Sequence, residues 1–310
     1  MRFLLTVREA LGRFYGKYDT AIRLLFKFAA AFLIFLSIRN MLGQTAAINY
    51  PLILLILAAG CMLLPSNTII LVAAGLILVH FYGISLEAAL VGGGILIIGM
   101  LVYFSLAPQS AWPLLLTGLA LGLKMGCVPA VLFGLLGGPL GAVGAAFGTL
   151  SYYLIQIVEK NGANLQSTAA EAAEAMVQKA AQLIQAVITE REMLVTAAAL
   201  AAALLVVYLI RIQAIKYAWM VASAAGCAAY LAVRAVGAAA FGVPLDALQL
   251  FAEILVSLLA GWMAQTMLFH LDYKKTQTVR FEDDEYYYYV KAVPKKKLHR
   301  KKRKRRAEGR

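Results

Sequence analysis

Cysteine and acidic residues are both scarce in this chain of 310 residues. Its three cysteines, Cys61, Cys127 and Cys227, stand far apart in apolar segments. An odd number of widely spaced cysteines argues against a disulfide framework and a zinc site, so we expect small residues that pack between helices. Aspartate and glutamate number 16 against 29 lysines and arginines, which gives a net charge of +13. Because the basic residues gather towards the two ends, this charge points to anionic lipid or an acidic partner.

The sequence also lacks the common signatures of enzymatic sites. It contains no GxxxxGK[ST] loop for nucleotide phosphates, no GxSxG nucleophile elbow and no HExxH zinc-binding helix. Its three histidines show no metal-ligand spacing. We therefore predict a protein that is not an enzyme and that needs neither a cofactor nor a metal ion.

Apolar residues make up 62% of the chain, and its mean hydropathy is +0.77. Soluble domains average about 45–50% apolar residues. Because the excess lies in long uninterrupted runs, we predict an all-α polytopic membrane protein with about eight transmembrane helices. These helices are expected at residues 24–41, 50–64, 67–84, 86–106, 140–158, 193–210, 217–241 and 245–271.

Residues 112–138 are apolar enough for a membrane but are repeatedly interrupted by glycine and proline. Gly137, Gly138 and Pro139 should end one helix before another begins. Non-helical backbone at membrane depth survives only where protein or a water-filled cavity surrounds it. We therefore interpret residues 112–138 as a broken hairpin, either re-entrant or spanning. The small residues spaced four apart around it, and the triplet at residues 92–94, indicate close helix crossings.

Two amphipathic segments flank these apolar regions. Residues 1–23 read as an interfacial helix in the headgroup plane, with a helix packed on the protein itself as the alternative. Residues 159–192 form a polar excursion between a first membrane bundle at 24–158 and a second at 193–271. A capping box from Thr168 to Glu171 opens a helix there. That helix either docks a partner or second copy, or lies against its own membrane domain.

Basic residues predict the orientation in the membrane. The N-terminal segment, the loop at residues 211–216 and the C-terminal tail are all basic, so each should face the cytoplasm. If residues 112–138 return to their own side, about eight full spans place both termini inside. A ten-span version satisfies the same parity. Arg39 is the main violation, because it falls at the outer end of the first span.

Four ionisable residues inside the predicted membrane regions form a candidate polar site. Arg234 and Glu253 should lie at similar depth on adjacent helices as a buried pair, and Asp246 near the mouth could join them. This group is either a proton or ion relay, or a structural pair that fixes helix register. Lys124 lies in the broken hairpin beside half-helix ends, as in transporters that hold anionic groups. The alternative is that its side chain extends to the cytoplasmic surface.

Residues 272–294 predict a cytoplasmic β-hairpin just beneath the membrane. Strand-like segments at 276–281 and 286–293 flank an acidic turn at 282–285. Because two strands alone are marginal in water, the hairpin should pair with a partner strand, a second copy or the underside of the membrane domain. Its candidate partner-binding residues are Phe281, Tyr286, Tyr287, Tyr288 and Tyr289.

The last segment, residues 295–310, is predicted to be a disordered polybasic tail. Such clusters bind anionic headgroups at about 1 kcal/mol per basic residue near the surface. Nucleic acid is the alternative partner, but the segment has no interleaved aromatic residue for base stacking, so lipid is favoured. The candidate lipid-binding residues are Lys295, Lys296, Lys297, Arg300, Lys301, Lys302, Arg303, Lys304, Arg305 and Arg306.

The stretch RFEDDEYYYYVKAVPK, residues 280–295, follows the last span and a basic loop. It resembles the C-terminal signature of a group of uncharacterised multi-pass membrane proteins of bacteria, some of them labelled transporter permeases. The resemblance implies a bacterial plasma membrane location, and it carries no functional residue over to this chain. In layout alone, the glycine-rich core also resembles small bacterial membrane modules of larger complexes, such as shape-determining or vitamin-uptake components.

Two functions from different classes remain open on the sequence. The first is a non-enzymatic membrane component of a larger membrane or cell-envelope complex, either a scaffold or a transporter subunit without its own motor. The second is an autonomous transporter or channel for a small, anionic solute. A water-filled cavity that reaches Lys124 would favour the transporter, whereas a solid, lipid-like interior would favour the component.

Overall fold

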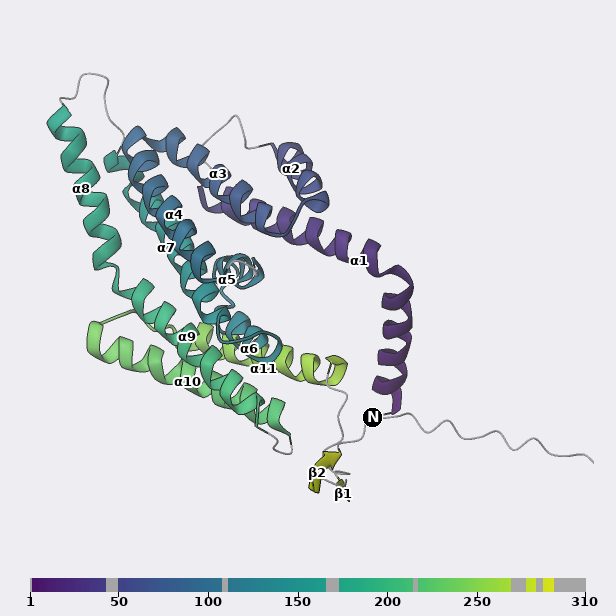
Figure 1. Ribbon diagram of the computed structural model, residues 1–310. Coiled ribbons are helices and arrows are strands. Elements are labelled where there is room, and N and C mark those ends of the chain that lie inside the picture. Colours follow the sequence, from purple (N-terminus) through teal and green to yellow (C-terminus); the bar gives the residue numbers. More distant parts are fainter. Residues whose placement is uncertain are drawn as a thin grey trace, which may run out of the picture.

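The computed structural model describes residues 2–42, 50–107, 111–165, 173–213, 217–268, 277–282 and 287–292. These residues form eleven helices and a two-stranded sheet (Figure 1). Seven of the described helices are long and apolar enough to cross a membrane. The chain is therefore a helical membrane-embedded protein. The seven spanning segments are Phe14–Leu42, Asn67–Ile84, Leu86–Leu106, Gly141–Gly162, Arg191–Arg211, Ala218–Phe241 and Ala247–Met267.

The N-terminal helix α1, Arg2–Leu42, is bent where Tyr18 leaves helical geometry at φ −122° and ψ 27° (Figure 1). The bend lies four residues inside the first span, Phe14–Leu42, and five residues before the predicted boundary at 23. Helix α2, Pro51–Leu63, has 13 residues, or about 20 Å at 1.5 Å per residue. The expectation of about eight long spans is therefore corrected to seven, because α2 is shorter than a hydrocarbon core of about 30 Å.

Helices α3, Asn67–Ile84, and α4, Leu86–Leu106, form a tight antiparallel pair. The Ser85 side chain accepts a hydrogen bond from the backbone N–H of Ala88 and so caps α4. A Cβ added at Gly92 would lie 2.5 Å from the Phe81 ring. The glycine triplet thus provides the close approach that the sequence predicts.

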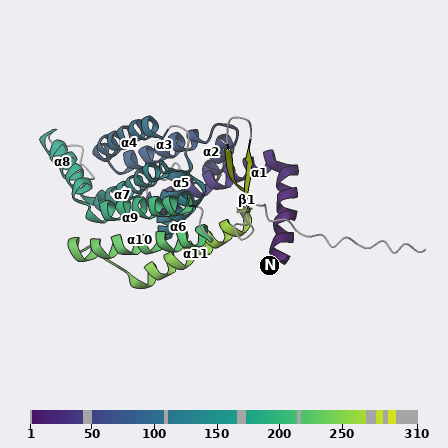
Figure 2. The same ribbon diagram turned by 60° about the horizontal axis from the view of Figure 1, so that its bottom comes forward.

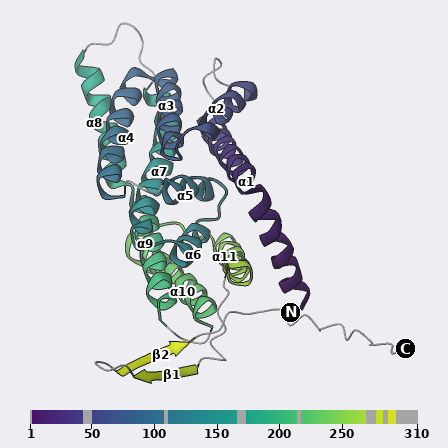
Figure 3. The same cartoon turned by 45° about the vertical axis from the view of Figure 1, so that its right-hand side comes forward.

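Two short helices occupy the glycine-rich region, α5 at Trp112–Gly122 and α6 at Cys127–Leu136. Helix α6 stops before Gly137 and α7, Gly141–Leu165, begins just after Pro139, as predicted. Helix α5 crosses α7 steeply (Figures 1 and 3). The first hydrophobic core lies here and joins buried residues mainly from α1–α5, α7 and α8.

The second core is built mainly by α6, α9, α10 and α11. Helices α9, Arg191–Arg211, and α10, Ala218–Phe241, lie side by side (Figure 2). Helix α11, Ala247–Leu268, packs on α6 and α10.

Residues 159–192 do not form one separate helix. Helix α7 continues to Leu165, and a separate helix α8 covers Ala173–Thr189. Leu183 and Val187 of α8 are buried in the first core, and α8 contacts α4 and α7. Helix α8 therefore lies against its own membrane domain. The predicted capping box at Thr168 lies outside the described residues.

Two strands follow the last helix, β1 at Gln277–Glu282 and β2 at Tyr287–Ala292. They pair antiparallel, with Gln277 opposite Ala292 and Glu282 opposite Tyr287. They overlap both segments for which the sequence predicts strands, and β1 includes Glu282, which the sequence assigns to the turn. Tyr286 and the basic residues from 295 onward lie outside the described residues.

Candidate functional site

Glu253 on α11 is the centre of a buried polar cluster. Its side chain is 6% exposed. The Tyr230 hydroxyl on α10 donates to Oε2 at 2.9 Å, and Gln249 Nε2, one turn earlier on α11, donates to Oε1 at 2.9 Å. Both carboxylate oxygens are thus hydrogen-bonded by neutral donors.

Helix α6 begins against this cluster. A Cβ added at Gly126, the residue before α6, would lie 2.9 Å from the Tyr230 hydroxyl and 3.5 Å from Glu253 Oε2. A side chain larger than hydrogen would therefore displace the Tyr230 hydroxyl or move the start of α6. The positive end of a helix dipole favours a nearby carboxylate, so Glu253 and the start of α6 stabilise each other.

Arg234 lies in a second polar group, one helical turn along α10 from Tyr230. Its guanidinium donates to Thr196 Oγ1 on α9 at 2.7 Å. The Thr196 hydroxyl is also hydrogen-bonded to the Tyr153 hydroxyl on α7 at 3.1 Å. Thr196 and Tyr153 are both buried. This group ties together three helices, α7, α9 and α10.

The predicted ion pair of Arg234 and Glu253 is not formed. Within the described ranges, the only salt bridge joins Arg23 and Asp19 near the start of the first span. The prediction assumed a turn of three residues between α10 and α11, but the connection at 242–246 has five and is irregular. The register therefore differs by one turn, and Tyr230 rather than Arg234 lies opposite Glu253.

The other two candidate residues also lie outside the Glu253 cluster. Asp246 is exposed, and its Oδ1 accepts from the backbone N–H of Leu248 at 3.0 Å and Gln249 at 3.3 Å. It is therefore the N-terminal cap of α11. Lys124 is exposed in the connection between α5 and α6. Its φ of +56° is left-handed, a conformation that is strained for any residue with a Cβ.

Arg211, at the end of α9, holds the other end of α6. Its Nη1 donates to the carbonyl oxygens of Gly134 at 3.3 Å and Gly137 at 3.0 Å, and also to that of Leu135. The last carbonyls of a helix have no partner within the helix, so a cation placed there satisfies them and complements the dipole. Arg191, at the start of α9, makes one weaker contact of this kind with the Phe241 carbonyl at 3.5 Å.

Cys127 on α6 and Cys227 on α10 meet in the second core. Their Sγ atoms are 3.8 Å apart, and both residues are buried as free thiols. The sequence carries no sign of this contact because one hundred positions separate the two residues. Both cysteines lie between packed helices, which is the role predicted for them.

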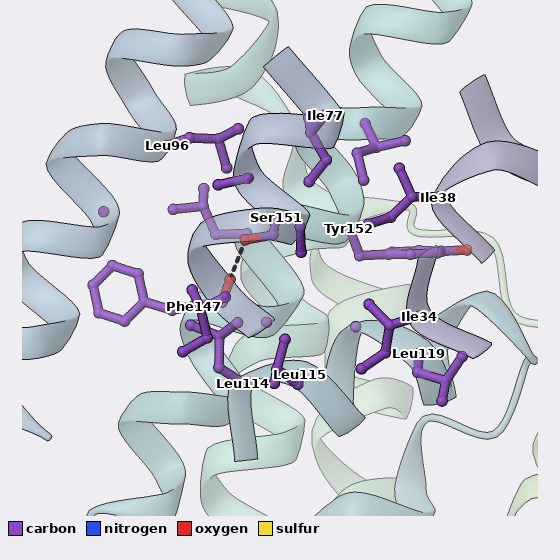
Figure 4. A pocket seen from close by; sticks show the side chains of 18 of the residues that line it. Ile34, Ile38, Ile77, Leu96, Leu114, Leu115, Leu119, Phe147, Ser151 and Tyr152 are labelled. Atoms are coloured by element: carbon purple, nitrogen blue, oxygen red, sulfur yellow. Dashed lines mark hydrogen bonds between the residues drawn. The ribbon is translucent and has the colours of Figure 1, made fainter. Parts of the chain in front are cut away.

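A cavity of about 80 Å³ lies in the first bundle, between α1, α3, α4, α5 and α7 (Figure 4). Its lining contains no charged side chain and none of the four candidate polar residues. The polar side chains at its wall are Ser37, Ser151 and Tyr152. Ser151 donates to the Phe147 carbonyl at 2.9 Å, and the Tyr152 hydroxyl accepts from Gln156 at 2.8 Å.

Sequence reasoning therefore found Glu253 and Arg234 but missed their partners. Gln249 could have been recognised because it precedes Glu253 by four residues, and Tyr230 because it precedes Arg234 by four. Thr196, Tyr153 and the carbonyls bound by Arg211 carry no such local signal. In its chemistry, the assembled cluster is a satisfied hydrogen-bond network. Within the described residues, no group of three or more His, Cys, Asp or Glu side chains could hold a metal ion.

No family model, curated protein or solved structure matches this chain. Its function therefore has to be argued from the contacts described above.

Proposed function

We propose that this chain is a non-enzymatic integral component of a larger membrane or cell-envelope complex, either a scaffold or a transporter subunit without its own motor. One observation carries the proposal: the polar groups within the helices are directed to the protein itself. Glu253, Arg234 and Arg211 all hydrogen-bond to side chains or carbonyls of neighbouring helices. The cavity is apolar and its lining does not include Lys124. A cavity that is apolar and does not reach Lys124 supports a component more than a transporter.

The paired strands after α11 supply a surface for a partner. A sheet of two strands is marginally stable in water, and its outer edges have unpaired backbone groups that can accept another strand. We propose that a partner strand or a second copy completes this sheet. Phe281, Tyr287, Tyr288 and Tyr289 belong to the two strands. The basic residues at 295–306 would hold the sheet near anionic headgroups.

We further propose a bacterial plasma membrane location with both termini in the cytoplasm. Support comes from α2, whose last turn reaches back to α1: Lys27 Nζ lies 3.3 Å from the Leu64 carbonyl oxygen. The end of α2 therefore lies beside Lys27, near the middle of the span Phe14–Leu42, so α2 runs back along the second half of α1. Counted as a crossing with the seven long spans, α2 places both termini on one side. The start of α1 and the end of α11 also lie near each other in Figures 1 and 3.

The experiment that tests the component proposal is gentle extraction of the tagged full chain, followed by native mass measurement and mass spectrometry. In one variant, Gly-Ser replaces residues 287–292. In the matched control, the ten basic residues between 295 and 306 become Gln. We expect a stoichiometric complex with the wild type and the control, and its loss in the strand variant. A monomer or homodimer without a partner in all three samples would contradict the proposal.

One observation favours the alternative, an autonomous transporter or channel for a small anionic solute. Lys124 holds a strained left-handed backbone at the joint between two short helices, and such strain often marks functional positions. The test is uptake of phosphate or acetate into proteoliposomes that contain the purified chain. The transporter function predicts uptake that Lys124→Gln abolishes and Lys124→Arg retains. Absence of uptake by the wild type leaves the component proposal alone.

A further inference from the structure

The connection between α5 and α6 leaves three consecutive side chains uncovered. Leu123, Lys124 and Met125 are all exposed, whereas Leu121 before them and Gly126 after them are buried. Lys124 makes no side-chain hydrogen bond or ion pair with the residues that the structure describes. The uncovered part of the connection is therefore one cation between two apolar side chains.

This connection lies inside the hydrocarbon region. A Cβ added at Gly126, two residues after Lys124, would lie 2.9 Å from the Tyr230 hydroxyl. Tyr230 is close to the middle of the spanning helix α10, about 17 Å from either end at 1.5 Å per residue. Consecutive Cα atoms are about 3.8 Å apart, so the backbone of Lys124 is at most about 8 Å from that of Gly126. The Lys124 backbone is therefore well below both surfaces of the membrane.

A lysine at this depth needs a negative group. Charged side chains inside a bilayer are costly, and they pair with an opposite charge or with backbone carbonyls. Glu253 is close, since its Oε2 would lie 3.5 Å from the same added Cβ, but it is buried. Both of its oxygens already accept hydrogen bonds from Tyr230 and Gln249. The charge of Lys124 is therefore left for a group outside the chain.

Three sources of an anion do not fit this position. A dissolved solute needs a water-filled cavity, but the cavity of the first bundle has an apolar lining that does not include Lys124. A lipid phosphate lies outside the hydrocarbon core, whose midplane is about 15 Å from either face. A second copy of this chain offers no exposed carboxylate at mid-depth among the described spans, because Glu253 is buried. The other acidic residues of these spans lie within five residues of a span end: Asp19, Glu87, Glu159 and Glu192.

We infer that the exposed connection between α5 and α6 is the docking site for a transmembrane helix of a different protein, which carries an aspartate or glutamate near the middle of its span. The inference rests on the proposed function as a component of a larger complex. The partner's carboxylate pairs with Lys124, and apolar side chains of the same helix contact Leu123 and Met125. Helix α5 packs mainly in the first core and α6 in the second, so the partner helix binds where the two bundles join.

The test is site-specific photocrosslinking of the full chain in the membranes of cells that make it. Benzoylphenylalanine replaces Leu123, and mass spectrometry locates the residue to which it is joined after irradiation. In the matched control the same group replaces Leu101, an exposed leucine of the spanning helix α4. We expect the probe at Leu123 to label a membrane segment of another protein, within about two helical turns of an aspartate or glutamate. The probe at Leu101 should not label that segment.

Substitutions of Lys124 make the test specific to its charge. We expect Lys124→Gln to lower the yield of the cross-link and the amount of co-purified partner about tenfold, and Lys124→Arg to retain both. Exchange of the two charges, by Lys124→Glu together with a lysine in place of the partner's carboxylate, should restore the complex. Thermal unfolding of each purified variant shows whether it is folded.

Two results would overturn the inference while the component proposal stands. The first is a complex whose amount and cross-link are the same in wild type and in folded Lys124→Gln. The second is cross-linking from Leu123 only to lipid or to a second copy, although native mass measurement still finds a complex. If native mass measurement finds no partner at all, the component proposal fails and this inference fails with it.

Discussion

Helices α5 and α6 are the two halves of one glycine-rich segment, yet different forces hold them. Helix α5 is fixed by steric fit: a Cβ added at Gly148 of α7 would lie 2.5 Å from the Leu114 carbonyl oxygen of α5. The one hydroxyl of α5, on Thr117, is buried and has no hydrogen-bond partner in the described part of the chain. Helix α6 instead has polar groups at both ends, with Glu253 and Tyr230 at its start and Arg211 at its finish.

This difference matches the two bundles that the halves join. The surroundings of α5 are apolar and contain the cavity, and close backbone approach at glycine holds α5 against α7. The surroundings of α6 form the second core, and hydrogen bonds to its two ends specify where it lies along its neighbours. The chain thus combines a bundle joined by close backbone packing with a bundle in which hydrogen bonds fix both ends of α6.

Removing the polar clamp on α6 should have the largest effect. Arg211→Ala leaves several carbonyls at the end of α6 without a partner, and we expect a loss of about 3 kcal/mol in the free energy of unfolding. Arg191→Ala, at the other end of α9, removes one long contact and should cost less than about 0.5 kcal/mol. Denaturant unfolding in detergent measures both. Equal losses in the two variants would show that the clamp does not distinguish α6.

Disturbing the steric fit of α5 should have the next largest effect. Gly148→Ala drives a methyl group into backbone, which cannot give way, and should cost about 2 kcal/mol. Gly118→Ala is the control at the same crossing, because its nearest neighbour would lie at 3.7 Å. Thermal unfolding of the two variants compares them directly, and a control as unstable as Gly148→Ala would contradict the crossing geometry.

Removing one hydrogen bond at the start of α6 should have a smaller effect. Tyr230→Phe leaves Glu253 Oε2 without its donor, and we expect a loss of about 1.5 kcal/mol. Tyr82→Phe, on the exposed face of α3, removes a hydroxyl from a side chain that is 68% exposed and should change nothing. The same unfolding assay applies. A Tyr230→Phe variant as stable as wild type would mean that the contact does not contribute to stability.

Substitution of Lys124, which lies between α5 and α6, by glycine should raise the stability of the chain. Lys124→Gly removes the strain of a left-handed residue with a Cβ and should stabilise the chain by about 1 kcal/mol. Lys124→Ala removes the charge but keeps the strain, so it separates the two contributions. We expect the thermal midpoint of unfolding to rise for Lys124→Gly and to stay unchanged for Lys124→Ala. An equal rise in both variants would show that loss of the charge, and not relief of the strain, stabilises the chain.

Sequence alone predicted the features that depend on local pattern. Apolar run length gave the long spans, and Gly137 with Pro139 marked the end of α6. The triplet at residues 92–94 was correctly assigned to close packing, but a Cβ at Gly94 would meet nothing within 4 Å, so only part of the triplet is needed. Strand-like composition around an acidic turn located the two strands to within one residue at each end.

The polar contacts could not be predicted because each depends on the mutual register of distant helices. An error of one turn, about 5.4 Å, was enough to replace Tyr230 with Arg234 as the expected partner of Glu253. The thiols of Cys127 and Cys227 meet across a hundred positions. Arg211 was interpreted only as a marker of the cytoplasmic side, since a carbonyl acceptor leaves no trace in side-chain patterns.

The clamp on α6 also sets an order for biosynthesis. Gly134 and Gly137 precede Arg211 by 77 and 74 residues, so α6 leaves the ribosome well before the group that satisfies its last carbonyls. Backbone groups without partners are not tolerated in hydrocarbon. The last carbonyls of α6 therefore gain this partner only after α9 has been synthesised. The final position of α6 is thus completed by a later part of the chain, and a chain that ends before Arg211 lacks that contact.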